Sequence, residues 1–320
     1  MTLADFPPWF VRIFGTVFGL LWGSFLNVVI ARVPLGMSVV TPGSHCFACQ
    51  AKVQPYDNIP VLSYLLLRGK ARCCGAPFSS RYAFVELIGG ALALAIVEHL
   101  VLPLGPNESA LRAGAVFLCS LAFALSLVAA AFIDLDHLYI PDAVPYGGTI
   151  LGIGTASFRG LSFTEAAVGA LVGFVGVWLP FDVLYRAVRG RTGMARGDAK
   201  LVMMAGAFFG WKGAFFAVVA GSFQAVIATL VILLFKGKID DAEAVVRERE
   251  AILAEIAALP EDERAEAEAE LAGDPIFEEG GSGLAARLAF GPFLALAMLE
   301  YLFFGQKLMD VLFAFPEAGP

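Results

Sequence analysis

The chain has 320 residues, of which 58% are hydrophobic and 16% are charged, and its formal net charge at pH 7 is −7. So apolar a composition excludes a soluble globular domain, and basic residues are not clustered as in a nucleic-acid-binding surface. Residues 240–279 carry 15 of the 29 acidic residues, whereas the rest of the chain has a net charge of +5. The acidity is therefore local, and the apolar runs elsewhere predict a polytopic membrane protein.

Eight apolar runs predict membrane-spanning helices, which need about 20 residues to cross a hydrocarbon core of about 30 Å. The first run has no basic leader and no small-residue cleavage site, so it is predicted to be retained as a span rather than removed as a signal peptide. The sixth run is short and rich in small residues. The predicted spans are residues 13–31, 83–104, 113–133, 143–158, 164–182, 198–211, 213–235 and 287–306.

These spans predict an all-α fold with about eight transmembrane helices and a small cysteine-containing loop domain. Two polar stretches interrupt the apolar runs and divide the chain into five parts. The parts are a first transmembrane segment at 1–31, a cysteine-containing loop domain at 32–82, a transmembrane core with the candidate catalytic residues at 83–235, an acidic helical hairpin at 236–287, and a last transmembrane helix with a tail at 288–320.

The distribution of Lys and Arg predicts the orientation, because cytoplasmic connections carry an excess of these residues. The connections 32–82, 186–200 and 236–287 hold 17 of the 22 Lys and Arg residues. They are therefore predicted to be cytoplasmic, with both termini on the opposite side. Counting the spans places the short connection 134–142 on the cytoplasmic side as well.

The loop domain holds four of the five cysteines, namely Cys46, Cys49, Cys73 and Cys74. Disulfides are disfavoured on the cytoplasmic side, so paired cysteines there predict metal ligands, and zinc takes about four of them. Cys46-Phe47-Ala48-Cys49 has the spacing of one zinc knuckle, whereas the adjacent pair has poorer geometry because neighbouring side chains diverge. His45 is a candidate substitute for one ligand. The alternative is a small folded loop with free thiols.

The stretch 239–279 predicts two polar helices separated by Pro260. Ala, Val, Ile and Leu recur at helical spacing among Glu and Arg before this proline, and acidic residues then suit the positive end of a second helix. We expect a solvated helical hairpin without chemistry of its own; a docking site for a partner is the alternative.

Three aspartates lie at the ends of apolar runs. Asp142 begins the fourth run and Asp198 the sixth, where a carboxylate can cap backbone N–H groups, so capping is an alternative to function for both. Asp134 ends the third run, where its charge opposes the helix dipole, and this favours a functional role. Asp136 is predicted to face solvent.

Asp134 and Asp198 are predicted to lie on the same side of the membrane. Two facing carboxyl groups in a low-dielectric site share a proton. The ionised member can take a proton from water while the protonated member polarises a scissile carbonyl, as in aspartic proteases. The alternatives are a proton- or cation-coupled transporter that uses the same carboxylates, and a membrane scaffold that docks components of a pilus or secretion system.

Several blocks along the chain together resemble one family, the bacterial type IV prepilin peptidases, within the intramembrane aspartyl proteases marked by Gly-x-Gly-Asp. They occur in the family's order and cover most of the chain. The blocks are Gly23-Ser24-Phe25-Leu26-Asn27-Val28-Val29, Tyr56-Asp57-Asn58-Ile59-Pro60-Val61-Leu62-Ser63-Tyr64, Arg81-Tyr82, Val85-Glu86-Leu87, Ile133-Asp134, Ile140-Pro141-Asp142, Gly197-Asp198-Ala199-Lys200-Leu201 and Phe290-Gly291-Pro292-Phe293-Leu294-Ala295.

The resemblance implies an enzyme of the bacterial inner membrane that cuts the basic leader from prepilins or pseudopilins at the cytoplasmic face. It also implies N-methylation of the new N-terminus with S-adenosylmethionine. The catalytic aspartates carry over onto Asp134 and Asp198, and the first pair of the family's zinc-binding tetracysteine loop carries over onto Cys46 and Cys49. Expected partners are the prepilin substrates, membrane lipid and components of type IV pilus or type II secretion assembly, but not nucleic acid.

Three features depart from the family's pattern. The first glycine of Gly-x-Gly-Asp is Ala195, which predicts a loss of backbone freedom. The second Cys-x-x-Cys aligns with residues 71–74, so Cys74 is in place and Cys73 is a possible substitute for the other ligand. The hairpin 239–279 replaces a short connection.

Three further residues are expected to support the aspartates. Asp142 is expected to act as a cap, Gly197 to allow close approach of the backbone, and Lys200 to be a charged neighbour of Asp198. The alternative for Lys200 is that its long side chain only extends to the membrane interface.

Overall fold

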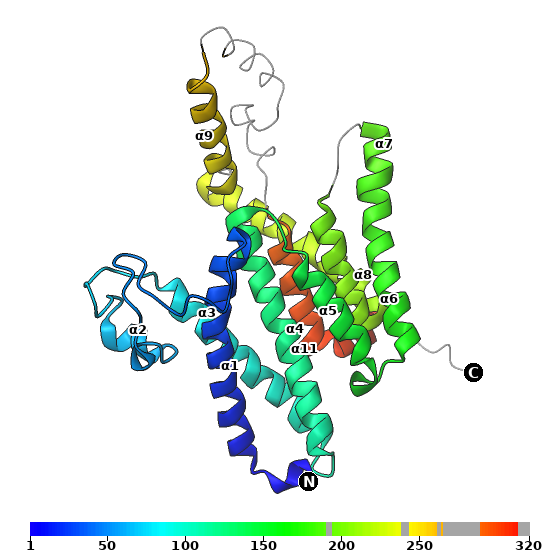
Figure 1. Ribbon diagram of the computed structural model, residues 1–320. Coiled ribbons are helices and arrows are strands. Elements are labelled where there is room, and N and C mark those ends of the chain that lie inside the picture. The colour runs from blue at the N-terminus through cyan, green and yellow to red at the C-terminus, as the bar shows by residue number, and fades with distance from the viewer. Residues whose placement is uncertain (190–193, 238–242, 261–263, 265–288, 313–320) are drawn as a thin grey trace.

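The computed structural model describes residues 1–189, 194–237, 243–260, 264 and 289–312, and these residues are helical apart from turns, loops and three isolated β-bridges. The long helices stand side by side in a bundle, the cysteine-containing domain (residues 32–82) projects to one side, and α9 extends beyond one end (Figure 1). The helices are α1 Pro8–Arg32, α2 Leu62–Leu67, α3 Arg81–Ile96, α4 Ala110–His137, α5 Ala143–Gly154, α6 Phe163–Trp178, α7 Tyr185–Arg189, α8 Arg196–Lys236, α9 Glu243–Ala257 and α11 Gly291–Leu312.

The all-α membrane fold is confirmed, but the count of about eight spans is not. Among the described residues, five helical segments are long and apolar enough to cross a membrane: Pro8–Leu35, Arg81–Leu104, Ala110–His137, Phe163–Arg189 and Arg196–Lys236. α5 has only 12 residues, or about 18 Å of helix, which is shorter than the hydrocarbon core. The apolar part of α11, Gly291–Gly305, is also shorter than a full span.

The predicted sixth and seventh runs both lie in α8, which is kinked at Gly210. This residue has φ 73° and ψ −176°, a backbone conformation that glycine adopts readily. A Cβ atom placed on Gly173 of α6 would lie 2.6 Å from the Val202 oxygen and 3.2 Å from the Ala214 Cβ. A straight helix would separate those two residues by about 18 Å. Therefore α8 folds back at Gly210, and both arms pack against the same part of α6.

Glycines allow the helices of the bundle to approach closely. A Cβ atom on Gly19 of α1 would overlap the carbonyl oxygen of Gly89 of α3. In the same way, a Cβ atom on Gly206 of α8 would overlap the carbonyl oxygen of Gly169 of α6. Small residues at such interfaces let the backbones of membrane helices come into contact and gain van der Waals packing. These two pairs join α1 to α3 and α6 to α8.

We expect Gly206→Ala to destabilise the fold by about 1–3 kcal/mol, because the added methyl group must push α6 and α8 apart. Gly176→Ala on α6 is the matched control, because a Cβ atom there would meet nothing within 4 Å. Thermal unfolding of the purified protein in detergent measures the difference. Equal unfolding temperatures for the two variants would contradict the close packing of α6 on α8.

α4 lies at the centre of the bundle and contributes to two hydrophobic clusters. Leu121 and Val128 pack in the cluster formed with α1 and α3, whereas Phe123 and Leu127 pack in the cluster formed with α8 and α11. The central position of α4 buries its last turn, which carries Asp134. The first candidate carboxylate is therefore held by the core of the bundle.

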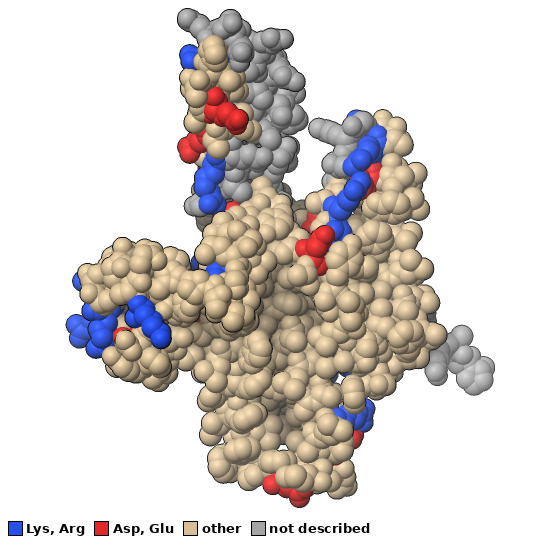
Figure 2. Space-filling view, in the orientation of Figure 1, with Lys and Arg blue, Asp and Glu red and all other residues tan. Residues whose placement is uncertain are grey.

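Charged side chains are distributed toward the two ends of the bundle. On the face shown in Figure 2 they gather on the cysteine-containing domain, on α7 and α9, and near the N-terminus, and the body between them is uncharged. An uncharged band between charged ends is the pattern of a membrane-embedded bundle.

The predicted acidic hairpin is described only in part. α9, Glu243–Ala257, is the helix expected before Pro260. Residues 261–263 and 265–279, which include the predicted second helix, lie outside the described residues.

Candidate active site

Asp134 and Asp198 lie at the same end of the bundle and are both buried, with 6% of each residue exposed. Asp134 is in the last turn of α4 and Asp198 in the first turn of α8. The side chain of Ile140 connects the two: it lies 3.4 Å from the Cβ position of Gly197, next to Asp198, and 3.2 Å from that of Gly291, which contacts Asp134. Both carboxylates therefore adjoin residues that pack on the same side chain. The structure therefore brings the predicted pair together.

The Asp134 carboxylate is anchored by the start of α11. The backbone N–H of Gly291 donates a 2.9 Å hydrogen bond to Asp134 Oδ2. Gly291 is the first residue of α11, where backbone N–H groups have no partner within the helix, and a carboxylate satisfies one of them. This role of Gly291 was not predicted, although a Gly-Pro pair at the start of an apolar run is a recognisable helix-start signal.

If Asp134 and Asp198 act as a catalytic pair, we expect Gly291→Ala to lower the activity of the pair strongly while leaving the protein folded. The added Cβ atom would lie 2.7 Å from Asp134 Oδ2, so the carboxylate has to move. Gly197→Ala is the comparison, because its Cβ atom would be in ordinary contact with Ile140 at 3.4 Å. A displaced catalytic group lowers the rate by about 100-fold, against a few-fold for the comparison. Steady-state rates of substrate cleavage test this, and equal losses would contradict the anchoring role of Gly291.

Two of the expectations about the Gly-x-Gly-Asp segment change. Ala195 has φ −67° and ψ 145°, an extended conformation open to any residue, so the missing first glycine does not restrict the backbone. The Cβ position of Gly197 is 3.4 Å from the Ile140 side chain, an ordinary contact, so the described residues show no close backbone approach that requires a glycine here.

Asp142 and Lys200 pair with each other. Asp142 is at the N-cap position of α5, as predicted, but its side chain makes no capping hydrogen bond. Instead Lys200 Nζ lies 2.5 Å from Asp142 Oδ1 and 5.1 Å from the centre of the Tyr146 ring. In the described part of the chain Lys200 is therefore the ion-pair partner of Asp142, and its expected role as a charged neighbour of Asp198 stays a prediction. This pair ties the start of α5 to the start of α8.

Asp136, which was expected to face solvent, is partly exposed and is also paired. Both of its carboxylate oxygens accept hydrogen bonds from Arg81 at the start of α3, at 3.0 and 2.6 Å. The guanidinium group also lies 4.7 Å from the centre of the Phe132 ring. Bidentate pairs of this kind fix geometry as well as charge. Arg81 therefore holds the end of α4, two residues beyond Asp134, against α3.

A third buried carboxylate, Asp182, was missed by the sequence analysis. It lies in a π-helical turn, Leu179–Leu184, that continues α6, and its side chain is 5% exposed. Arg186 and Arg196 donate to its two oxygens at 2.7 and 2.9 Å. Because Arg196 is two residues before Asp198, Asp182 anchors the segment that carries the second candidate carboxylate. A carboxylate inside an apolar span is the signal that could have identified it.

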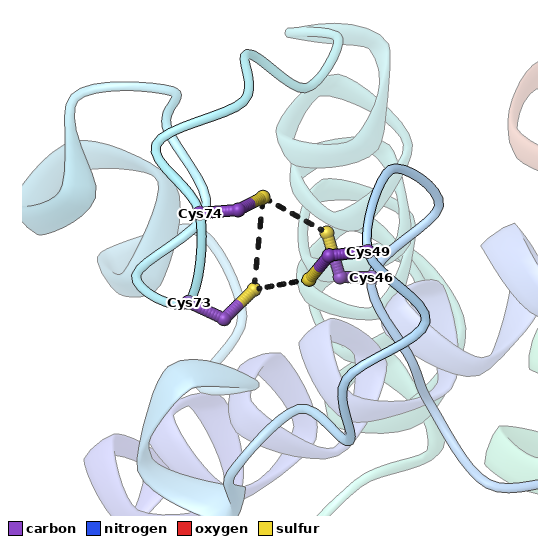
Figure 3. Close-up of side chains that lie close together, drawn as sticks. All are labelled: Cys46, Cys49, Cys73 and Cys74. Atoms are coloured by element: carbon purple, nitrogen blue, oxygen red, sulfur yellow. Dashed lines mark hydrogen bonds between the residues drawn. The ribbon is translucent and has the colours of Figure 1, made fainter.

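The four cysteines of the loop domain form one cluster, and Figure 3 shows their side chains pointing toward one another. Their sulfur atoms all lie within 4.8 Å of one another. Cys49 Sγ and Cys73 Sγ are 3.3 Å apart, and Cys46 Sγ and Cys74 Sγ are 3.7 Å apart. His45 is outside the cluster, and its Nδ1 is 3.0 Å from the Gly43 oxygen.

Two similar loops present these cysteines. In the first, the Cys46 N–H donates to the Ala51 oxygen and Gln50 has φ 61°; in the second, the Ala71 N–H donates to the Ala76 oxygen and Gly75 has φ 73°. When the two loops are aligned by these hydrogen bonds, Ala71 corresponds to Cys46 and Cys74 corresponds to Cys49. The second loop thus has alanine where the first has its leading cysteine, and Cys73 fills the cluster despite its unfavourable spacing.

The cluster fits a tetrahedral metal ion. Zinc–sulfur bonds of about 2.3 Å place neighbouring sulfurs about 3.8 Å apart, close to the observed separations. Hydrogen bonds from the backbone of Cys49 and Ala48 lower the pKa of the Cys46 thiol to about 6, whereas the neighbouring Cys49 sulfur raises the pKa of Cys73 to about 12. Four thiolates so close together would repel one another, and a bound cation would remove this repulsion and favour the ionised form of all four.

The fold and the paired carboxylates define a class: an all-helical membrane protein with a candidate diaspartyl site. Comparison with known families agrees, because the model of the bacterial peptidase A24 N-terminal domain matches residues 17–100 and that of the type IV leader peptidase family matches residues 121–230. The chain belongs to the type IV leader peptidase family and is a multi-pass membrane enzyme.

Three relatives illustrate the similarity, each named prepilin leader peptidase/N-methyltransferase. The Myxococcus xanthus protein is 38% identical over 244 residues, which cover 74% of this chain and 69% of that protein. The Klebsiella pneumoniae protein is 35% identical over 61% of this chain and 83% of its own length. The Pseudomonas aeruginosa protein is 34% identical over 66% of this chain and 76% of its own length. No solved structure matches the chain.

Proposed function

We propose that the protein removes the leader peptide from type IV prepilins or pseudopilins and then methylates the new N-terminus, with S-adenosylmethionine as the methyl donor. The observation that carries the peptidase half is the meeting of Asp134 and Asp198, two buried carboxylates from distant parts of the chain, at one end of the bundle. Membership of the type IV leader peptidase family supports the substrate class, and the names of the relatives support methylation.

In the proposed mechanism the two carboxylates share one proton. The ionised member removes a proton from a water molecule held between them, and the water oxygen attacks the scissile carbonyl carbon. The protonated member donates its hydrogen bond to the carbonyl oxygen, and a tetrahedral intermediate then collapses with transfer of a proton to the leaving amine. Asp134 is oriented for this task by the Gly291 N–H, which holds one of its oxygens.

We assign the site to the cytoplasmic face of the bacterial inner membrane. The basis is the excess of Lys and Arg in the connections 32–82, 186–200 and 236–287, which hold 17 of the 22 in the chain. A prepilin inserted with its apolar helix in the membrane then presents its leader at the level of Asp134 and Asp198. Pilus or type II secretion components are the assembly partners that this location permits.

We further propose that Cys46, Cys49, Cys73 and Cys74 hold a structural zinc ion. A closed set of four thiolates leaves no open position for a substrate, so the ion would stabilise the fold of the loop domain. The domain has few buried apolar residues of its own, among them Cys46, and small domains of this kind commonly depend on a metal.

The proposed function is tested with purified protein in detergent mixed with a type IV prepilin. The expected result is a product that is shorter by the leader, and, after S-adenosylmethionine is added, heavier by one methyl group in mass spectrometry. Uncut prepilin in the presence of folded protein would overturn the peptidase assignment. If Asp134→Asn abolished gradient-driven solute uptake instead, the transporter alternative would replace it.

A further inference from the structure

A cavity of about 880 Å³ lies where the cysteine-containing domain meets the bundle. The last turns of α1, from Ser24 to Arg32, form one wall, and the first turns of α3 form another with Tyr82 and Glu86. The volume is in the range of about 300–1,000 Å³ that small-molecule sites occupy. Asp134 and Asp198 do not line this cavity, so it is a second candidate binding site, separate from the peptidase site.

Aromatic side chains form a continuous row along the cavity. The Tyr64 and Phe78 rings meet edge to face at 5.4 Å, and Phe78 and Tyr82 at 6.5 Å. Phe47, which is 69% exposed, continues the row at 6.4 Å from Tyr82. Ring faces of this kind stack with planar heterocycles and attract cations. The row therefore suits a ligand that combines a base-like ring with a positive charge.

Glu86 places a carboxylate in the same cavity. Of the two lining acids, Asp57 is ion-paired with Arg72 at 2.9 Å, whereas Glu86 has no ion pair within the described part of the chain. Its Oε2 accepts a 2.7 Å hydrogen bond from the Val61 N–H, which leaves Oε1 for a ligand. A carboxylate beside aromatic rings is attractive to an ammonium or sulfonium group.

The position of Glu86 is fixed by its surroundings. A Cβ atom on Gly23 of α1 would lie 2.9 Å from the Glu86 Cα atom, so the two helices are in close contact at this level. Val61, whose N–H is held by Glu86, has φ 63°, which is strained for a β-branched residue. Strained backbone held in place by neighbouring groups is typical of ligand sites. The carboxylate is thus preorganised.

The cavity is connected to the peptidase site through one ion pair. Tyr82, in the cavity wall, follows Arg81, which binds both oxygens of Asp136 at 3.0 and 2.6 Å. Asp136 is two residues beyond Asp134 on α4. The ion pair therefore fixes the wall of the cavity against the helix end that carries Asp134.

We propose that this cavity binds S-adenosylmethionine for N-methylation, an inference that rests on the proposed function. The adenine ring stacks on the aromatic row, and the Glu86 carboxylate pairs with the positively charged part of the donor. In the transfer step the lone pair of the neutral N-terminal amine forms a bond to the donor's methyl carbon. The carbon–sulfur bond breaks with its electron pair going to sulfur, and the amine loses one proton to water. The products are the N-methylated peptide and S-adenosylhomocysteine.

Binding of S-adenosylmethionine to the full chain in lipid nanodiscs, measured by calorimetry, tests the assignment. Glu86→Gln keeps the acceptor for the Val61 N–H but removes the charge, and we expect it to raise Kd about tenfold. Phe47→Ala removes an exposed ring, and we expect a rise in Kd of about fivefold or more from lost stacking. Glu300→Gln is the control, because Glu300 lies on α11, is bound to Gln224 and does not line the cavity. Its Kd should match that of the unmodified protein.

Mass spectrometry of the cleaved product separates failure of this inference from failure of the proposed function. We expect Glu86→Gln and Phe47→Ala to lower the methylated fraction of the cleaved product at limiting donor. If the unmodified protein methylates its product and both folded variants bind the donor as tightly as it does, the cavity is not the donor site and the proposed function stands. If the unmodified protein cleaves prepilin but neither binds the donor nor methylates, then methylation itself is excluded, and the cavity assignment with it.

Discussion

Asn substitution of either Asp134 or Asp198 is expected to lower the rate of prepilin cleavage by about 1,000-fold or more, the size of effect seen when an acting catalytic group is removed. The reason is that an amide can neither accept the proton of the attacking water nor share a proton with its partner. Asn has nearly the same shape as Asp, and in Asp134→Asn the amide oxygen can still accept the Gly291 N–H, so α11 keeps its anchor. The loss should therefore appear in kcat for a protein that remains folded.

The matched control is Asp136→Asn, two residues from Asp134 on the same helix end. Asp136 is paired with Arg81 and is not placed in the proton-sharing pair, so we expect a loss of no more than about tenfold. Single-turnover cleavage of purified prepilin, with thermal unfolding of each variant, makes the comparison. Full activity of either the Asp134→Asn or the Asp198→Asn variant would remove the diaspartyl mechanism. Equal losses for Asp134→Asn and Asp136→Asn would point to a structural effect of this helix end.

The sequence predicts which carboxylates are candidates because each lies at a boundary between an apolar run and a polar connection. Asp134 and Asp198 are identifiable in this way, and the structure places both at one end of the bundle. The main anchor of Asp134 is not predictable in the same way. The Gly291 N–H comes from a distant part of the chain, and nothing in local periodicity says that α11 begins against the end of α4.

The span count shows a second limit of the sequence. Hydropathy identifies the apolar segment from Asp198 to Phe235 but does not say how its two runs are joined. The structure joins them in one helix, α8, with a kink at Gly210, and the fold-back is visible only from the contacts of both arms with Gly173. Asp182 was missed for a related reason. Its carboxylate is paired with Arg196, which lies 14 residues later, and no sequence pattern shows that these two residues are close in space.

The cysteine cluster shows how tertiary structure can overcome poor local spacing. Adjacent cysteines were expected to diverge, yet Cys73 Sγ reaches within 3.3 Å of Cys49 Sγ and 3.9 Å of Cys74 Sγ. The turn that ends at Gly75, with φ 73°, bends the second loop so that both sulfurs face the first. The first loop supplies Cys46 and Cys49 with the spacing of a zinc knuckle. The second loop supplies Cys74 in the position equivalent to Cys49, and Cys73 in a position that has no equivalent cysteine in the first loop.

This arrangement leads to the second large effect. We expect Cys73→Ala to reduce bound zinc from about one equivalent per chain to a small fraction of that, because three thiolates bind the ion far more weakly than four. Adding Ala71→Cys to this variant should restore the ion, because residue 71 takes the position in the second loop that Cys46 has in the first. Zinc content of the purified protein by elemental analysis, with thermal unfolding before and after chelation, gives the readout.

The single variant Ala71→Cys is the control, because it leaves all four sulfurs in place and should not lower the zinc content. The double variant carries the decisive information. If it stays as zinc-free as Cys73→Ala, the two loops are not equivalent and the resemblance of their backbone hydrogen bonds has no bearing on metal binding. If Cys73→Ala alone keeps its zinc, then Cys73 is not a ligand, and the cluster binds its ion with Cys46, Cys49, Cys74 and a ligand other than Cys73. Restored zinc in the double variant would mean that a cysteine at residue 71 and the natural Cys73 can each supply the fourth ligand. The chain would then have moved one ligand from residue 71 to residue 73 and kept the metal site.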